Sequence, residues 1–207
     1  MAYIKNTAFE VKVSNSIFNS TQNVAGKFGS FEGSVFTPDV CSAGFIVKQD
    51  SLIPSQGYEN LANPRKNGNT WYMVVAADGI STGYANGHTG IFAANTYNVH
   101  SVVSANGEMK YNLGINTLGL AIPADEIGDF TELIVGEQYK WPIGNFTAEP
   151  TEGQIVTISN GLWTPSDSAP ETGGVYGEVV RVEPFNEGAS FFGDGYVVRI
   201  LFTAYIS

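Results

Sequence analysis

Short apolar runs, each broken within a few residues by glycine, asparagine or proline, follow one another along most of this chain. Many of these runs alternate or are rich in β-branched and aromatic residues, which is typical of strands with a buried face. No long stretch keeps the i, i+3, i+4, i+7 spacing of an amphipathic helix. The predicted strands are 8–13, 44–48, 70–76, 91–94, 99–103, 118–122, 133–135, 155–158, 176–182 and 196–202.

Turn chemistry separates these runs. Asparagine and aspartate followed by glycine tolerate the positive φ angles that tight hairpin turns require. Asn160-Gly161 lies between the apolar runs 155–158 and 162–164, so a hairpin is the simplest interpretation there. The other pairs of this kind are Asn67-Gly68, Asp78-Gly79, Asn86-Gly87, Asn106-Gly107 and Asp194-Gly195.

The pattern predicts a mainly β fold, as a sandwich and/or a small β-barrel of short antiparallel strands. The only helical signal is one short turn in 125–133, after Pro123. Residues 14–33 hold many Asn, Ser and Gly residues, which indicates an irregular N-terminal arm that a neighbour orders.

Composition and loop signals divide the chain further. We expect an N-terminal arm at 1–33, a central β domain at 34–140 and an acidic, barrel-like C-terminal β domain at 141–207. The segment 141–145 is interpreted as part of a loop-like boundary between the last two regions. One continuous β fold is the alternative, because chain ends often meet in space.

The charge of the chain is strongly uneven. The formal net charge is −10. Residues 125–207 carry thirteen acidic but only three basic residues, whereas the acidic and basic residues of 1–123 are equal in number. An acidic surface repels phosphate backbones, so direct binding to nucleic acid is disfavoured. This charge serves solubility, or it forms a face that docks on a basic partner surface.

Sequence motifs for catalysis or metal binding are weak. Cys41 is the only cysteine and lies in an apolar run, so we expect a buried small side chain and no intrachain disulfide. His88 and His100 lack the spacing of zinc ligands. We therefore predict no catalytic residues, no metal site and no cofactor.

Carboxylates leave two weaker options open. Asp125-Glu126 and the pair Glu149 and Glu152 could serve a hydrolase, but they lie in polar turns where carboxylates are usually solvated. Glu183, Glu187 and Asp194 flank a glycine-rich loop, yet the spacing of a calcium-binding loop is absent.

Aromatic residues are the last constellation. Most are expected to fill the core, because aromatics dominate packing between sheets. Those in the loop 184–193 and in the arm are instead predicted to anchor a partner, with a plug under the barrel as the alternative for the loop residues. The predicted partner-binding residues are Phe18, Phe28, Phe31, Phe185, Phe191 and Phe192.

The run 153–165, followed by a glycine-rich segment and by 176–182, resembles the small β-barrel modules of capsid decoration proteins of tailed bacteriophages. The wider pattern of many Asn and Gly residues, short strands and an acidic surface is similar to that of phage virion proteins. This resemblance covers about the last 60 residues. It implies a capsid-associated role but transfers no individual residue.

We therefore hypothesise a non-enzymatic virion protein that binds the outer capsid surface and bridges capsomers. Its partner would be the major capsid protein, with self-association into a homo-oligomer such as a trimer. The N-terminus lacks the apolar core of a signal peptide, so synthesis in the host cytoplasm is expected, without membrane binding. The alternative functions are a receptor- or glycan-binding module of a fibre or baseplate, presenting Trp71, Tyr84 or Trp163, and a carboxylate hydrolase.

Overall fold

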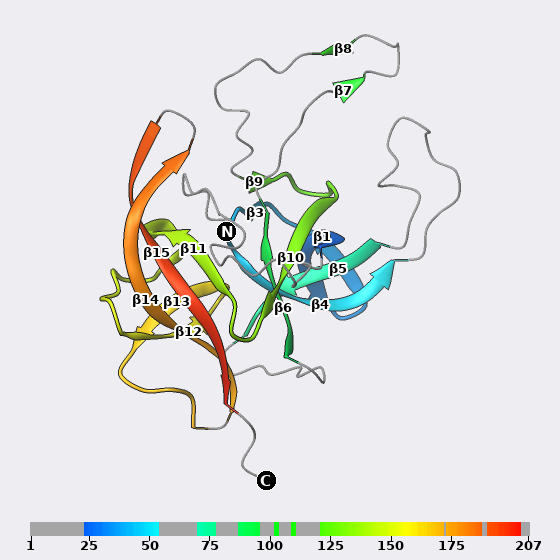
Figure 1. Ribbon diagram of the computed structural model, residues 1–207. Coiled ribbons are helices and arrows are strands. Elements are labelled where there is room, and N and C mark those ends of the chain that lie inside the picture. The colour runs from blue at the N-terminus through cyan, green and yellow to red at the C-terminus, as the bar shows by residue number, and fades with distance from the viewer. Residues whose placement is uncertain are drawn as a thin grey trace.

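The computed structural model describes residues 23–53, 70–77, 87–95, 102–103, 109–110, 121–171, 173–187 and 190–203. Strands dominate these residues (Figure 1). Their bounds are β1 (Asn23–Glu32), β2 (Val35–Pro38), β3 (Cys41–Ser42), β4 (Ile46–Ile53), β5 (Thr70–Val75), β6 (His88–Ala94), β7 (Val102–Val103), β8 (Met109–Lys110), β9 (Ala121–Ile122), β10 (Gly128–Ile134), β11 (Gln138–Pro142), β12 (Ile155–Ser159), β13 (Leu162–Ser166), β14 (Gly174–Glu187) and β15 (Ser190–Thr203), with one 3-10 helix, η3 (Ile143–Asn145), before β12.

Five strands from the segment 23–134, which we call the first half, form a closed ring in the order β1-β10-β6-β4-β5. The ring closes because β1 pairs on one side with β10, antiparallel, and on the other with β5, parallel. The remaining pairs are antiparallel. Strand β2 extends β1 as a hairpin beyond the ring, with Phe31 opposite Phe36.

The second half forms a five-stranded barrel in the order β11-β15-β14-β12-β13. A bridge between Phe146 and Trp163 brings the chain after β11 against β13. The Thr147 N–H donates to the Trp163 carbonyl at 2.8 Å beside this bridge. These contacts join the two ends of the sheet, which leaves no free edge at this point.

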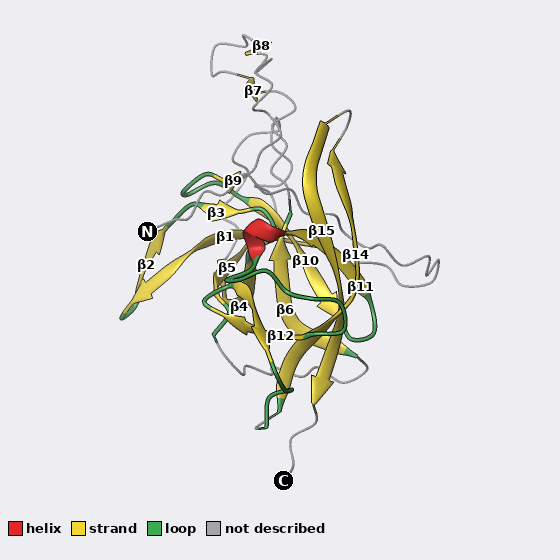
Figure 2. Ribbon diagram, turned by 90° about the vertical axis from the view of Figure 1, so that its left-hand side faces the viewer, coloured by secondary structure: helices red, strands yellow, loops and turns green. Residues whose placement is uncertain are grey.

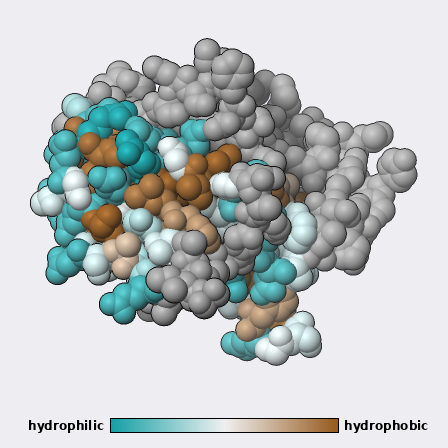
Figure 3. Space-filling model, turned by 60° about the horizontal axis from the view of Figure 1, so that its bottom comes forward, coloured by the Kyte–Doolittle hydropathy of each residue, from teal (hydrophilic) through white to brown (hydrophobic). Residues whose placement is uncertain are grey.

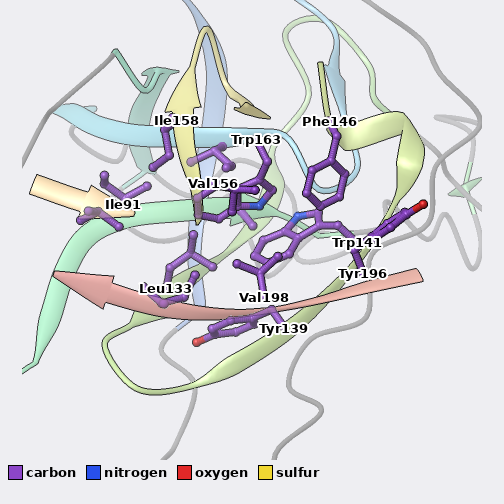
Figure 4. Close-up of a cluster of buried hydrophobic side chains, with 14 of the residues drawn as sticks. Ile91, Leu133, Tyr139, Trp141, Phe146, Val156, Ile158, Trp163, Tyr196 and Val198 are labelled. Carbon is purple, nitrogen blue, oxygen red and sulfur yellow. The ribbon is translucent and has the colours of Figure 1, made fainter. Parts of the chain in front are cut away.

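The ring and the barrel share one hydrophobic core. Ile46, Ile91 and Leu133 of the ring belong to the same buried cluster as Trp141 and Trp163 of the barrel (Figure 4). A second cluster contains Phe28, Val47, Met73, Phe92 and Phe130 of the ring together with Cys41 of β3 and Ile122 of β9, and no residue of the barrel.

Strand β6 shows why the apolar run 91–94 is continuous. Ile91 and Ala93 enter the shared core, whereas Phe92 and Ala94 enter the cluster of the ring. Successive side chains of a strand point to opposite faces, so a strand buried on both faces has no polar positions to alternate with.

Several predictions are confirmed. The fold is mainly β and contains a barrel, and strands occupy most of the predicted runs that fall in the described residues. Asn160 and Gly161 have φ angles of 47° and 76° and connect β12 to β13, as the Asn-Gly signal predicts. The predicted strand at 8–13 lies outside the described residues.

The irregular arm is the main correction. Asn23–Glu32 is a regular strand, so that prediction is wrong for this part, and residues 1–22 lie outside the described residues. Gly26 and Gly29 suggested a loop, but a Cβ atom there would collide with the Met73 and Phe36 side chains, respectively. These glycines make room for neighbours from other strands.

Two local predictions also need correction. The segment 125–133 was expected to hold a helical turn, but it contains the start of strand β10, whose Phe130 and Leu133 are buried. The segment 141–145 was interpreted as loop, yet Trp141 and Pro142 complete β11. The domain boundary predicted at 140/141 falls inside that strand, and the division into domains stays a prediction.

Candidate partner-binding surfaces

The β1–β2 hairpin carries Val35, which is more exposed than any other large hydrophobic residue in the described segments. Glu32 pairs with Val35, so the strands are joined by the two residues Gly33 and Ser34. Gly33 has a φ of 63°, the left-handed conformation that such a turn favours. Figure 2 shows this hairpin projecting from the rest of the molecule.

Three aromatic rings gather on one face of this hairpin. Phe31 and Phe36 lie directly opposite each other, so their side chains share a face, and their ring centroids are 5.3 Å apart. Tyr72 of β5 lies 5.3 Å from Phe31, edge to face, and 4.2 Å from Phe36. All three are half-buried. Mutual packing therefore fixes the rings while part of each stays accessible to a partner.

Val35, at the tip of the hairpin, is 65% exposed, the highest value among the large hydrophobic residues of the described segments. Val35 on one face of the hairpin, and Phe31, Phe36 and Tyr72 on the other, form what we call the hairpin surface. On the face turned to the viewer in Figure 3, hydrophobic residues also gather in a band near the centre-left, with hydrophilic residues around it. A valine exposed at the tip of a hairpin whose other face is stiffened by ordered rings is suited to enter a pocket of another molecule.

The predicted anchors are placed differently from one another. Phe31 belongs to the hairpin surface, but Phe28 is only 6% exposed and packs edge to face on Phe45 inside the ring. Phe18 lies outside the described residues. The backbones of Phe185, Phe191 and Phe192 belong to β14 and β15, while their side chains lie outside the description.

The β14–β15 hairpin is the second projecting element, and its turn end extends beyond the rest of the barrel (Figure 1). Irregularities of register at Val179/Arg181 and Pro184/Asn186 bend it. Its outer side is held by charges, because Glu183 pairs with Arg181 and with Lys140 of β11, at 3.8 Å. Arg181 also donates to Gln138 at 2.9 Å. These contacts join strands β14 and β11 across β15.

The candidate catalytic groups have structural partners. His88 Nδ1 lies 3.0 Å from Glu132 Oε2, and the other oxygen of this buried carboxylate accepts from the Gly90 N–H at 3.4 Å. This pair links β6 to β10. Within the described segments, no group of three or more His, Cys, Asp or Glu side chains is arranged to hold a metal ion.

Cys41 is buried, as predicted. Its burial, and secondarily the negative charge of Asp39, raise the pKa of the thiol well above its ordinary value. The thiolate, which is the reactive form, is therefore disfavoured at neutral pH.

The candidate carboxylates are dispersed. Asp125 forms an ion pair with Lys27 at 2.7 Å, and Glu149 accepts a hydrogen bond from Tyr196. Glu152 is exposed in a turn. Glu183, weighed as a calcium ligand, is instead paired with cations.

The glycan-binding alternative expects an exposed aromatic platform, to which the buried Trp163 does not contribute. Trp163 is fully buried, Trp71 is half-buried and Tyr84 lies outside the described residues. None of the helices in the described segments has the length and apolar character needed to cross a membrane.

Comparisons with protein-family models, with curated proteins and with solved structures gave no match to this chain.

Sequence reasoning identified Phe31 but missed its neighbours Phe36 and Tyr72. The first of these could have been found, because Phe31 and Phe36 lie symmetrically about the turn Gly33-Ser34 and so face each other in a two-residue hairpin. The position of Tyr72 follows from the parallel pairing of β1 with β5, which the sequence does not specify.

Proposed function

We propose that this chain is a non-enzymatic structural protein of a bacteriophage particle, which binds the outer capsid surface as a decoration protein and bridges capsomers. The hairpin surface supports this proposal most strongly. Val35 is 65% exposed at the tip of a projecting hairpin, and the rings of Phe31, Phe36 and Tyr72, packed together on the other face, stiffen that hairpin. The resemblance of 153–165 to capsid decoration modules supplies the biological setting.

The physical basis is an anchor on a rigid body. Full burial of a valine side chain contributes about 1.5 kcal/mol or more, and the mutual packing of the rings limits the conformational entropy that the hairpin loses on binding. One such anchor binds weakly. Self-association, as expected from the sequence, and the repetition of the partner on a capsid lattice multiply weak contacts into high avidity.

The first experiment locates the protein. Particles of the virus that encodes this chain are purified, and the protein is sought in them by mass spectrometry and by gold-labelled antibody. The proposal predicts labelling of the capsid exterior. Absence from the particles, or labelling confined to the tail, contradicts it.

The second experiment tests the anchor. Capsids assembled without this chain are mixed with purified wild-type protein or with Val35→Ser, and bound protein is measured by co-sedimentation. We expect the variant to lose about tenfold in apparent affinity. The matched control is Ile143→Ser, which removes an aliphatic side chain that is 43% exposed in η3, next to the barrel. Equal binding by wild type and Val35→Ser would refute the role of the hairpin surface.

A further inference from the structure

A second exposed apolar side chain lies at the end of the barrel from which the β14–β15 hairpin projects. Val182 is 39% exposed and lies directly opposite Tyr196, which in turn lies opposite Trp141. Residues opposite each other across strands share a face of the sheet, so Val182 continues the row of core side chains outward. Trp141 and Tyr196 in this row are buried, whereas Val182 remains uncovered.

Tyr196 forms the floor beside Val182. Its ring packs edge to face on Phe146, with centroids 5.2 Å apart, and only 3% of the residue is exposed. Its hydroxyl points away from the core (Figure 4) and donates to Glu149 Oε1 at 2.9 Å. The ring thus closes the core, while the hydroxyl holds a carboxylate at the surface.

Two carboxylates flank this position. Glu149 and Asp194 are both exposed. Glu149 accepts the hydrogen bond of the Tyr196 hydroxyl, and Asp194 lies two positions before Tyr196 on β15, so the side chains of Asp194 and Tyr196 leave the same face of the sheet. Burial, the hydrogen bond to Glu149 and the negative charges of Glu149 and Asp194 together raise the pKa of Tyr196 to about 12. We call Val182, Tyr196, Glu149 and Asp194 the barrel mouth.

The charge of the barrel mouth is not balanced within the described part of the chain. In the described residues, the basic side chains found close to carboxylates are Lys27, His88, Lys140 and Arg181, and their partners are Asp125, Glu132 and Glu183. Within the described part of the chain, neither Glu149 nor Asp194 forms an ion pair. An exposed aliphatic side chain beside two carboxylates that have no ion-pair partner in the described residues complements a basic side chain next to an apolar one.

We infer that the barrel mouth docks a basic segment of a partner protein, in which an arginine or lysine lies between Glu149 and Asp194 and a neighbouring apolar side chain covers Val182. A second copy of this chain fits poorly, because residues 125–207 hold thirteen acidic and three basic residues and would repel their own kind. The inference deepens the proposed function and rests on it for the partner, which would be a basic segment of the capsid protein.

The test uses the isolated, isotope-labelled full chain and a synthetic peptide of alternating arginine and leucine, with an alternating glutamate–leucine peptide as the control probe. Chemical shifts of backbone amides are followed during titration. We expect changes centred on Phe146, Val182 and Tyr196 for the basic peptide only. We also expect affinity to fall as salt rises from about 50 to 300 mM.

Matched variants separate this site from general acidity. The double variant Glu149→Gln with Asp194→Asn should weaken binding of the basic peptide about fivefold or more, and Val182→Ser should weaken it as well. The amide that replaces Glu149 still accepts the Tyr196 hydrogen bond, so the fold is retained. The control, Glu152→Gln with Asp167→Asn, removes the same charge from two other exposed positions and should leave affinity unchanged.

Three outcomes would overturn the inference: no binding of the basic peptide, shift changes centred elsewhere, or equal weakening by the control variant. None of them bears on whether the protein is found in virus particles. Conversely, peptide binding at the barrel mouth by a protein absent from particles would refute the proposed function and leave the barrel mouth as a docking site for another basic partner.

Discussion

The indole N–H of Trp141 donates to the carbonyl oxygen of Gly44 at 3.0 Å, and this bond joins the barrel to the ring. Asn145 makes a parallel link, because its side-chain amide donates to the Ala43 carbonyl at 3.1 Å. Both hydrogen bonds thus end on the short segment 43–44, directly before β4, and they add to the hydrophobic core that the ring and the barrel share. This arrangement couples the stability of the two halves of the chain.

The first prediction concerns this coupling. Trp141→Phe keeps an aromatic ring but deprives the Gly44 carbonyl of its donor, and we expect the free energy of unfolding to fall by about 1–3 kcal/mol. Urea unfolding, followed by circular dichroism and by fluorescence, should show one coincident transition, because both halves contribute to one core. Two separated transitions would contradict the coupling. Trp71→Phe, at a half-buried position, serves as the control.

The second prediction compares two glycines with similar backbones. Gly161 and Gly153 have φ angles of 76° and 81°, so alanine is strained at both, by about 1–2 kcal/mol. At Gly161 a Cβ atom would also collide with the Phe45 ring, whereas at Gly153 nothing lies within 4 Å. Gly161→Ala should therefore destabilise the fold by about 1–3 kcal/mol more than Gly153→Ala. Equal losses in urea unfolding would show that Phe45 moves aside freely.

The third prediction concerns alkaline pH. The pKa of Tyr196 is raised to about 12 in the folded chain, against about 10 for an unfolded tyrosine. The neutral phenol is thus favoured by folding: its contribution is complete below about pH 10 and is lost as pH rises toward 12. Stability should fall across this interval less steeply in Tyr196→Phe than in the wild type. Identical slopes in urea unfolding at successive pH values would argue against this.

The fourth prediction concerns Cys41. Because the thiol is 1% exposed and its pKa is raised, a thiol reagent at neutral pH should modify the native chain far more slowly than the urea-unfolded chain. The time course of labelling, read by mass spectrometry, measures the difference. Rapid labelling of the folded protein would show that the segment around Cys41 opens readily.

Local signals accounted for much of the fold. The β12–β13 hairpin was predictable because Asn160 and Gly161 carry the positive φ angles that their side chains allow. The runs of β5, β14 and β15 were predictable because their residues have strong strand preferences. In each case the deciding interaction lies within a few residues of the signal.

The elements that the sequence did not indicate depend on distant partners. Strand β1 contains Gly26 and Gly29. The absence of a Cβ atom at these positions leaves room for the side chains of Met73 and Phe36. Such glycines are indistinguishable from loop glycines until the neighbouring strand is known. Strand β10 follows a polar turn, and only its pairing with β1 and β6 explains why it is extended.

The candidate surfaces were predictable only in part, for the same reason. Phe31 and Phe28 looked equivalent in a glycine-rich segment, but the pairing of β1 places one at the hairpin surface and the other in the core. Glu149 was recognised only as a turn carboxylate. Its relation to Tyr196, 47 positions away, arises from closure of the barrel.

The closure of the ring by β1 and β10 also constrains how the chain is made. Asn23 lies opposite Thr131, so the first described strand cannot find this partner until more than one hundred further residues have left the ribosome. Contacts of such long sequence separation slow folding, and a strand without its neighbour has an edge open to pairing with other chains. We therefore expect the yield of native protein to be higher when the chain is overexpressed at lowered temperature or together with chaperones.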